Sequence, residues 1–142
     1  MRIGKLSDYA SMLMVQMSRM PERNVSARQL ASESGLTRPT VAALLKKLGR
    51  AGLVVSVRGV GGGYCLARPP QQISLADVVT AIEGPVELTA CAIADGHCEL
   101  EKDCGARPHW RTINQSIQAT LMLMSLADMA RPTVQLRRMD NG

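Results

Sequence analysis

Aromatic side chains are scarce in this chain of 142 residues, which has two tyrosines, one tryptophan and no phenylalanine. Proteins that bind single strands or sequence-specific RNA usually stack bases on aromatic side chains. The shortage therefore argues against those partners. If the chain binds a nucleic acid, duplex DNA is the better candidate.

Long hydrophobic runs are also absent. The richest apolar stretch covers residues 121–127 and ends at Asp128, and the first residues are not followed by an apolar run with a small-residue cleavage site. We therefore expect a cytoplasmic protein that does not enter membranes, in a compartment where thiols stay reduced. The length suits one domain with its own core, or a small domain plus an assembly element.

The net charge of +5 is concentrated in one half of the chain. Residues 1–70 hold eleven Lys/Arg and three Asp/Glu, a net charge of +8, whereas residues 71–142 hold six and nine, a net charge of −3. A cationic half suits a polyanionic partner. A solvated basic face is the ordinary alternative, but it does not explain the asymmetry, so we infer that residues 1–70 bind duplex DNA.

Apolar spacing predicts a first helix from about residue 6 to before Pro21, because buried-type residues recur at i, i+3, i+4 and i+7. These residues are Ala10, Leu13, Met14 and Met17. A second helix is predicted from Ser26 and Gln29, which are spaced as a capping box. Gly35 suits the left-handed position that ends it.

A third helix over residues 37–51 is the predicted DNA-recognition helix. Thr37 is its expected N-cap, and Pro39 is tolerated in the first turn. Its apolar stripe is Val41, Leu44, Leu45 and Leu48. Two capped helices joined by a tight turn are typical of a helix-turn-helix, although an ordinary helical hairpin has the same spacing.

Residues 53–67 predict a β-hairpin, or wing, which favours a winged helix-turn-helix over the ordinary hairpin. Strand-forming residues flank the glycine-rich turn at 59–63. This turn is not a nucleotide-binding loop, because no helix beginning with Lys-Ser or Lys-Thr follows it. The candidate DNA contacts are Arg28, Arg38, Thr40, Lys46, Lys47, Arg50, Arg58, Gly61 and Gly62.

The expected fold is mainly α-helical with this small wing, divided into four regions. The winged helix-turn-helix covers residues 1–84 and includes a supporting helix over 74–83, and a cysteine-containing segment covers 85–107. A helix over 108–131, apolar on more than one side, is expected to form a homodimer, and its length would be about 33 Å. Residues 132–142 are expected to be a disordered tail.

Cys91, Cys98 and Cys104 follow one another with the spacing C-x6-C-x5-C. The paired knuckles of zinc fingers and ribbons are absent. Thiolates in a polar loop suit an iron-sulfur cluster, with zinc less favoured and unliganded thiols a further alternative. Cys65 lies in the returning wing strand, far from these three, and is interpreted as a small apolar residue.

These features together resemble the winged-helix iron-sulfur regulators, a bacterial family that includes regulators of the isc and suf cluster-assembly operons and of the nitric-oxide response. The resemblance rests on Met1-Arg2-Ile3, Asp8-Tyr9-Ala10, the stretch from Gly52 to Tyr64 containing Arg58-Gly-Val-Gly-Gly-Gly-Tyr, the three cysteines, and Trp110. It covers about residues 1–130. It implies a homodimer on palindromic promoter DNA, with Cys91, Cys98 and Cys104 as cluster ligands.

The fourth ligand is where this chain departs from the isc-type pattern. In isc-type members a histidine stands three residues after the last cysteine. This chain has Arg107 at that position, and arginine is not a plausible iron ligand. Asp8 ranks first instead, because it matches an acid that nitric-oxide-type members contribute from the partner subunit, followed by His109 and then His97. Each also has an ordinary explanation as a helix-terminal or solvated residue. The choice between a 2Fe-2S and a 4Fe-4S cluster stays open.

We interpret the chain as a transcription regulator and not an enzyme, most simply a repressor of an iron-sulfur assembly operon. A nitric-oxide-responsive repressor is the alternative within the same class. A cysteine-based metal carrier or thiol redox protein is the alternative from another class. Neither a CxxC motif nor a Ser/His/Asp series supports that last hypothesis.

Overall fold

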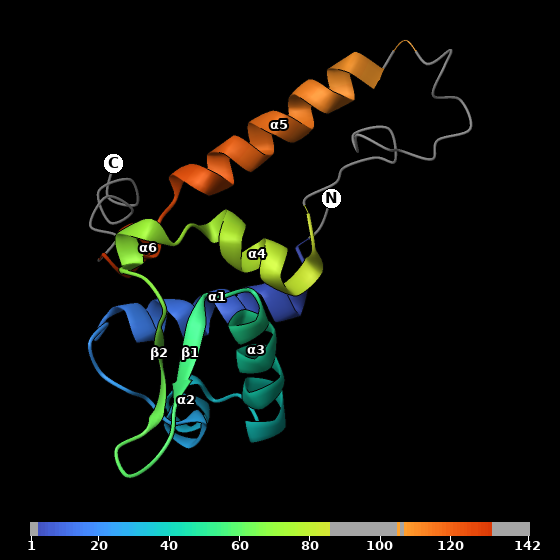
Figure 1. Cartoon of the computed structure of the whole chain (residues 1–142). Helices are drawn as coiled ribbons and strands as arrows, with labels where there is room; N and C mark the ends of the chain where they lie inside the picture. Colours follow the sequence, from blue (N-terminus) through green and yellow to red (C-terminus); the bar gives the residue numbers. More distant parts are fainter. Residues whose placement is uncertain (1–2, 86–104, 106, 132–142) are drawn as a thin grey trace, which may run out of the picture.

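The computed structural model describes residues 3–85, 105 and 107–131 (Figure 1). The elements in chain order are α1 (Lys5–Ser18), α2 (Ala27–Ser34), α3 (Arg38–Arg50), β1 (Val54–Val57), β2 (Gly63–Leu66), the 3-10 helix η1 (Pro70–Gln72), α4 (Leu75–Glu83), α5 (Arg107–Leu123) and α6 (Leu126–Ala130). A mainly helical chain with one antiparallel hairpin after a helix-turn-helix is the fold class that the sequence predicts.

The core lies where α1, α3 and α4 pack against one another. The predicted apolar stripes of α1 and α3 are confirmed, since none of their eight residues is more than 2% exposed. Val78 of α4 and Leu53 before β1 complete the same cluster. Helix periodicity therefore identified the buried faces correctly, because side chains three and four positions apart project from the same side.

The helix ends follow the predicted caps with one difference. Thr37 Oγ1 accepts a hydrogen bond from the Thr40 N–H, and Gly35 has a φ of 79° at the end of α2. Ser26 Oγ accepts from the Gln29 N–H, but the Gln29 side chain donates to Glu33 at 3.0 Å instead of returning to Ser26. The predicted capping box is therefore only half formed, because the Gln29 amide is held by the Glu33 carboxylate one turn away and its oxygen does not reach back to accept from the Ser26 N–H.

The returning wing strand is hydrogen-bonded on both of its edges. β2 pairs with β1 on one side, with Val55 opposite Cys65. On the other side the Val25 N–H donates to the Tyr64 carbonyl at 2.9 Å, and the Tyr64 N–H donates back at 2.8 Å. Gly63 permits this close approach, because at its φ of 145° a Cβ would lie 2.6 Å from the Val25 carbonyl oxygen.

The helix expected over residues 108–131 is two helices, which corrects the prediction. α5 ends at Leu123, and Ser125, with a φ of −86° and a ψ of 161°, caps the separate helix α6. Leu126, which a single long helix would place on a second apolar side covered by the partner, is instead fully buried in the core beside α1. The signal was present in the sequence, because Ser125 and Asp128 have the spacing of a capping box.

Ser7 is a buried polar residue of α1 that packs without a partner for its hydroxyl. Its residue is 0% exposed, and within the described ranges its Oγ has no hydrogen-bond partner. Removing an unsatisfied buried hydroxyl also removes its desolvation penalty, so Ser7→Ala should raise the free energy of unfolding by about 1 kcal/mol. Ser11→Ala is the matched control, because the Ser11 hydroxyl donates to the Ser7 carbonyl at 2.8 Å. Urea denaturation in which both variants lose stability equally would contradict this account.

Candidate DNA-binding surface and metal-binding segment

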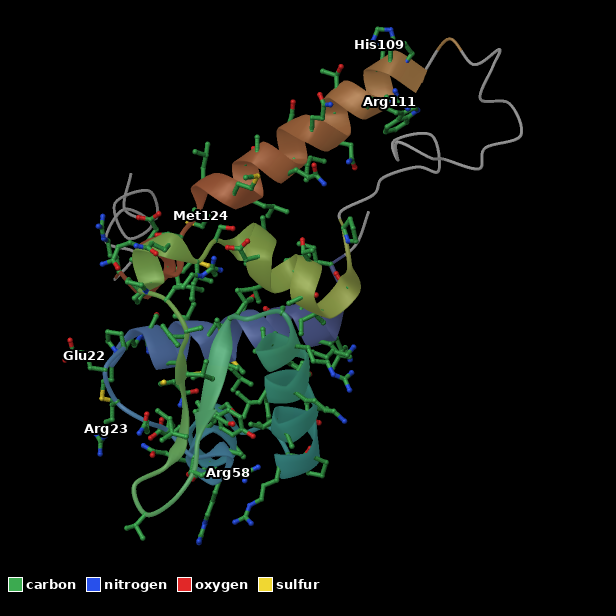
Figure 2. All side chains as sticks on the ribbon, viewed as in Figure 1. Glu22, Arg23, Arg58, His109, Arg111 and Met124 are labelled. Carbon is green, nitrogen blue, oxygen red and sulfur yellow. The ribbon has the colours of Figure 1, made fainter. Side chains whose placement is uncertain are left out.

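The recognition helix α3 and the wing meet at one end of the molecule. α3 runs into β1 with a short connection, so the beginning of α3 and the turn of the wing lie at the same end of the molecule (Figure 1). Figure 2 shows Arg58 at this same end. A helix that can enter a major groove is thus placed next to a hairpin that can reach the adjoining backbone or minor groove.

The predicted cationic contacts are all exposed. They are Arg28, Arg38, Lys46, Lys47, Arg50 and Arg58. In the part of the chain that the structure describes, the ion pairs that are found involve Arg68 and Arg131, and none of these six. Their charges are therefore available for phosphates, and each neutralised phosphate would release counterions and make binding salt-dependent.

Three smaller residues on this surface have more specific structural roles. Thr40, a predicted DNA contact, is half-buried, and its hydroxyl lies 2.9 Å from that of Thr37. Gly61 is exposed with a φ of 77°, and Asn24 donates to its carbonyl at 3.2 Å, which ties the turn to the α1–α2 connection. A side chain at Gly62 would collide with the Val57 carbonyl, so turn geometry alone requires this glycine. The hydrogen bond from Asn24 to the wing turn was not predicted from the sequence.

Most of the predicted metal ligands lie outside the described residues. These are Cys91, His97, Cys98 and Cys104. The described candidates are Asp8, exposed in the first turn of α1, and His109, exposed in the first turn of α5 (Figure 2). Among the described residues alone, no three His, Cys, Asp or Glu side chains come together as a metal site.

Asp8 lies close to where the cysteine-containing segment leaves the folded domain. Glu83 ends α4, and its carboxylate accepts from the Gly4 N–H at 2.7 Å, so the last turn of α4 touches the start of α1. Asp8 is one turn further along α1, where its N–H donates to the Gly4 carbonyl. Asp8 lines two adjoining grooves of about 700 and 630 Å³ along α1. This position gives Asp8 space for an incoming segment.

The donor set suits an iron-sulfur cluster. Cysteine thiolates are the usual protein ligands of such clusters, commonly four of them, and an oxygen or nitrogen ligand can take the place of a thiolate. The exposed carboxylate of Asp8 and the exposed imidazole of His109 both meet this requirement. Arg107 begins α5 and does not, because a guanidinium has no lone pair to donate.

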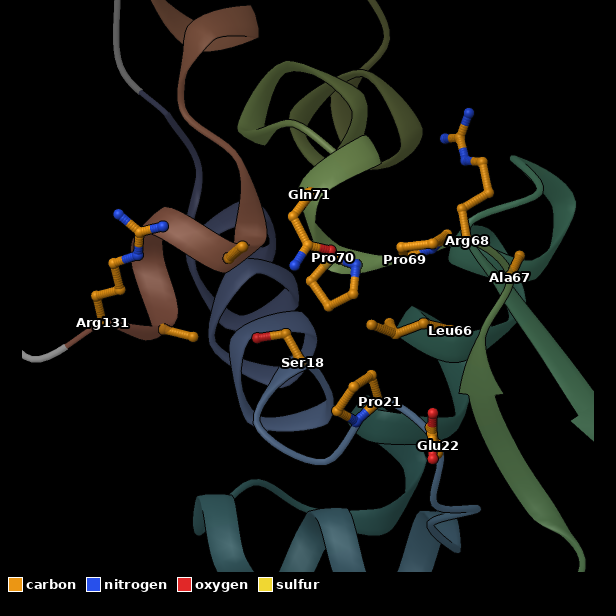
Figure 3. Close-up of a pocket in the computed structure, with 12 residues that line it drawn as sticks. Ser18, Pro21, Glu22, Leu66, Ala67, Arg68, Pro69, Pro70, Gln71 and Arg131 are labelled. Carbon is orange, nitrogen blue, oxygen red and sulfur yellow. The ribbon is translucent and has the colours of Figure 1, made fainter.

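A further cavity of about 600 Å³ lies between the end of α1, the end of β2, η1 and α6 (Figure 3). Proline and alanine side chains make up much of its wall. Two of its charged residues are already paired, Arg68 with Asp77 and Arg131 with Asp128. We assign no ligand to this cavity.

A model of the Rrf2 family, described as an iron-dependent transcriptional regulator, matches residues 3–132. This chain belongs to the Rrf2 family. Among its relatives, an HTH-type transcriptional regulator IscR of Serratia proteamaculans is 29% identical over 130 residues, covering 91% of this chain and 79% of that protein. A putative HTH-type transcriptional regulator, ORF2, of Azotobacter vinelandii is 33% identical, covering 95% of this chain and 83% of that protein.

Solved structures support the same assignment. IscR of T. potens superimposes with a TM-score of 0.71 at 29% identity, covering 91% of this chain and 85% of that one. CymR, the global cysteine regulator of B. subtilis, also has a TM-score of 0.71, at 28% identity, covering 92% of this chain and 96% of that one. The two structures superimpose on this chain equally well, although one is an IscR and the other a cysteine regulator. The same fold therefore serves regulators that are named for different signals.

This Rrf2-family protein is accordingly a DNA-binding transcription regulator, like its relatives, and not an enzyme. The predicted winged-helix DNA-binding fold is confirmed. In the described ranges, no helix is both long enough and apolar enough to cross a membrane.

Proposed function

We propose that this Rrf2-family regulator is a homodimeric repressor of an iron-sulfur assembly operon, and that its affinity for promoter DNA depends on a cluster held by Cys91, Cys98 and Cys104. One observation carries the proposal. The three-cysteine segment leads directly from α4 into α5, the helix whose exposed apolar side chains are the proposed contacts with a second copy, and Asp8 presents an exposed carboxylate in the first turn of α1. The fourth ligand is Asp8 of the partner subunit, with His109 and then His97 as the alternatives.

DNA binding is the task of α3 and the wing. Arg38 and Lys46 project from the exposed face of α3 toward base edges or phosphates, and Arg58 on the wing reaches the adjoining minor groove or backbone. Two copies of α3 in a symmetric dimer would bind half-sites one helical turn apart, about 34 Å. Sequence specificity therefore depends on how the two domains are held relative to each other.

The dimer is held by α5. Four large apolar side chains of this helix remain exposed in the single chain: Trp110, Ile113, Met122 and Leu123. Exposed apolar side chains of this size on one helix are a typical site for association with a second copy. Because α5 directly follows the cysteine segment, the same helix connects the proposed ligands to the dimer interface.

A bound cluster would link the thiolates in a redox-sensitive way. Loss of the cluster would change the protein's conformation. The residues of this chain provide the response. Cys91, Cys98 and Cys104 would hold the segment between α4 and α5 in one conformation, and Asp8 of the partner subunit would tie that segment to the partner's first helix. A regulatory switch requires that the tied and released forms differ in DNA affinity.

The proposal is tested by purifying the full chain without oxygen and measuring iron, sulfide, zinc and visible absorption. We expect iron and sulfide with a coloured protein, and a colourless product in Cys98→Ser. Colourless wild-type protein that resists reconstitution contradicts the cluster, and stoichiometric zinc would indicate a structural metal site instead. Salt-dependent binding to duplex DNA separates a regulator from a metal carrier or thiol redox protein.

Asp8→Ala is expected to keep the cysteine-held cluster but to shift its absorption and speed its loss to a chelator by at least about tenfold, since an outer partner alone accounts for 10–100-fold. Glu22→Ala is the control, because Glu22 is an exposed acid beyond the far end of α1. If Asp8→Ala behaves as wild type and His109→Ala does not, the second-ranked ligand is correct.

Nitric oxide is the second candidate signal, and Asp8 favours it because that position resembles an acid of the nitric-oxide-type members. In that case nitrosylation should abolish DNA binding. Repression should then be indifferent to the cellular demand for clusters. A repressor of an assembly operon should instead respond to that demand.

A further inference from the structure

Ser-Leu-Ala-Asp occurs twice in this chain, at residues 74–77 and 125–128. Both copies form complete capping boxes. In the first, the Ser74 N–H donates to Asp77 at 2.9 Å, and the Asp77 N–H donates to the Ser74 hydroxyl at 3.1 Å. In the second, the corresponding distances between Ser125 and Asp128 are 3.1 and 3.0 Å. The bond from the Ser125 N–H also lowers the pKa of the Asp128 carboxyl.

The two capping boxes are joined to each other through the backbone. Ser74 and Ser125 form an antiparallel bridge, in which the Leu75 N–H donates to the Met124 carbonyl at 2.8 Å and the Leu126 N–H donates to the Ile73 carbonyl at 2.9 Å. The first N–H groups of a helix normally have no partner within the helix. Here each such group is satisfied by the other segment. We call residues 73–77 and 124–128 the paired caps.

The paired caps lie where the proposed dimer helix joins the DNA-binding domain. α5 projects away from the domain along α4 (Figure 1), and Met124 marks the place where it returns (Figure 2). Immediately after the bridge, Leu126 is 0% exposed in the core of the domain. The direction in which α5 leaves the domain is therefore constrained at this point, where a backbone bridge and two capped helix starts fix the chain, in addition to the contacts of α5 with α4.

We propose that the paired caps are positioning residues for DNA binding, because they set the angle of α5 on the DNA-binding domain and hence the separation of the two recognition helices. This role rests on the proposed dimer. It needs no contact between the paired caps and DNA. The ion pair between Arg68 and Asp77 adds only a weak link to the wing, since its atoms are 3.8 Å apart and both side chains are more than 40% exposed.

Leu75→Pro is the variant that breaks the bridge while sparing the helix. Leu75 is the first residue of α4, where proline is well tolerated, and Ser74 before it has the extended conformation that proline requires, with a φ of −96° and a ψ of 162°. Proline has no N–H to donate to the Met124 carbonyl, and its ring occupies the space of the missing N–H. Leu75→Ala is the matched control, because it shortens the same side chain and keeps the N–H.

The readout is the dependence of DNA affinity on half-site spacing. A duplex is first selected from a random-sequence pool with the wild-type protein, and two base pairs are then inserted between its half-sites. The insertion turns one half-site by roughly 70° relative to the other. Wild type and Leu75→Ala should lose on the order of 100-fold in DNA affinity. This is about the loss expected from breaking two strong base contacts. Leu75→Pro should lose less than about tenfold, and all three should bind a single half-site alike.

Each outcome decides something. A Leu75→Pro chain that keeps the full spacing penalty overturns the role of the paired caps while the dimeric regulator stands. A wild-type chain that binds DNA without any spacing preference contradicts the proposed dimer itself. If Leu75→Pro shows a reduced helix content, Ser125→Ala combined with Asp128→Ala removes one cap without proline. That double variant should show the same reduced spacing penalty, and a full penalty would also overturn the role.

Discussion

Replacing Leu126 with alanine should lower the free energy of unfolding of the whole DNA-binding domain by about 2–5 kcal/mol, although residue 126 lies more than seventy positions beyond the recognition helix. Leu126 is 0% exposed and belongs to the cluster that contains the stripes of α1 and α3. The substitution leaves a cavity in that core, and the surrounding side chains relax only partly. Urea denaturation followed by circular dichroism measures the loss.

Leu123→Ala is the matched control for this prediction. The same side chain three residues earlier is 82% exposed at the end of α5, so its removal should change the unfolding free energy by less than about 0.5 kcal/mol in dilute protein. If the two variants lose stability equally, the break between α5 and α6 is wrong. A single continuous helix would then be the better description of residues 108–131.

Ile113→Asp should weaken the homodimer by on the order of 100-fold or more. Ile113 is 44% exposed on α5 next to the exposed Trp110. A symmetric interface loses this side chain from both copies, and burying one such side chain contributes roughly 1.5–3 kcal/mol. Placing two carboxylates near each other adds repulsion. Sedimentation equilibrium over a range of concentrations measures the dissociation constant.

Gln115→Asp adds the same charge to a different side of α5. Position 115 is two residues from Ile113, so the two side chains point about 160° apart around the helix axis. Gln115 lies on the same side of α5 as Met122 but about 10 Å before it along the axis, so this variant should weaken the dimer far less than Ile113→Asp. A comparable loss of dimer affinity in both variants would mean that the added charge, and not the loss of the Ile113 side chain, weakens association.

The DNA-binding half was largely predictable from the sequence because its signals are local. The stripes of α1 and α3, the cap at Thr37 and the glycine at the end of α2 each depend on neighbours a few residues away. Gly63 was assigned to the turn, but its close approach to Val25 was not predictable, because that contact joins two segments far apart in the sequence. Asn24 was missed for the same reason.

The C-terminal half was less predictable because two signals competed there. The apolar residues between Trp110 and Met129 fit a single long helix, and this pattern obscured the capping box at Ser125. The same four-residue sequence at Ser74 begins the supporting helix that was predicted over residues 74–83, where Gly84 and Pro85 mark a clear helix end. The cysteine ligands stay a prediction, as they lie outside the described residues, and the positions of Asp8 and His109 are compatible with two of the three fourth-ligand candidates.

The burial of Leu126 has a consequence for how such a regulator can be divided. A fragment that ends at Pro85 contains the recognition helix and the wing but leaves an unfilled space in its core where Leu126 packs. Gene truncation or limited proteolysis is therefore a poor route to a free, unregulated DNA-binding fragment. Evolution, too, could not exchange the C-terminal half for another module without first rebuilding the core of the N-terminal half.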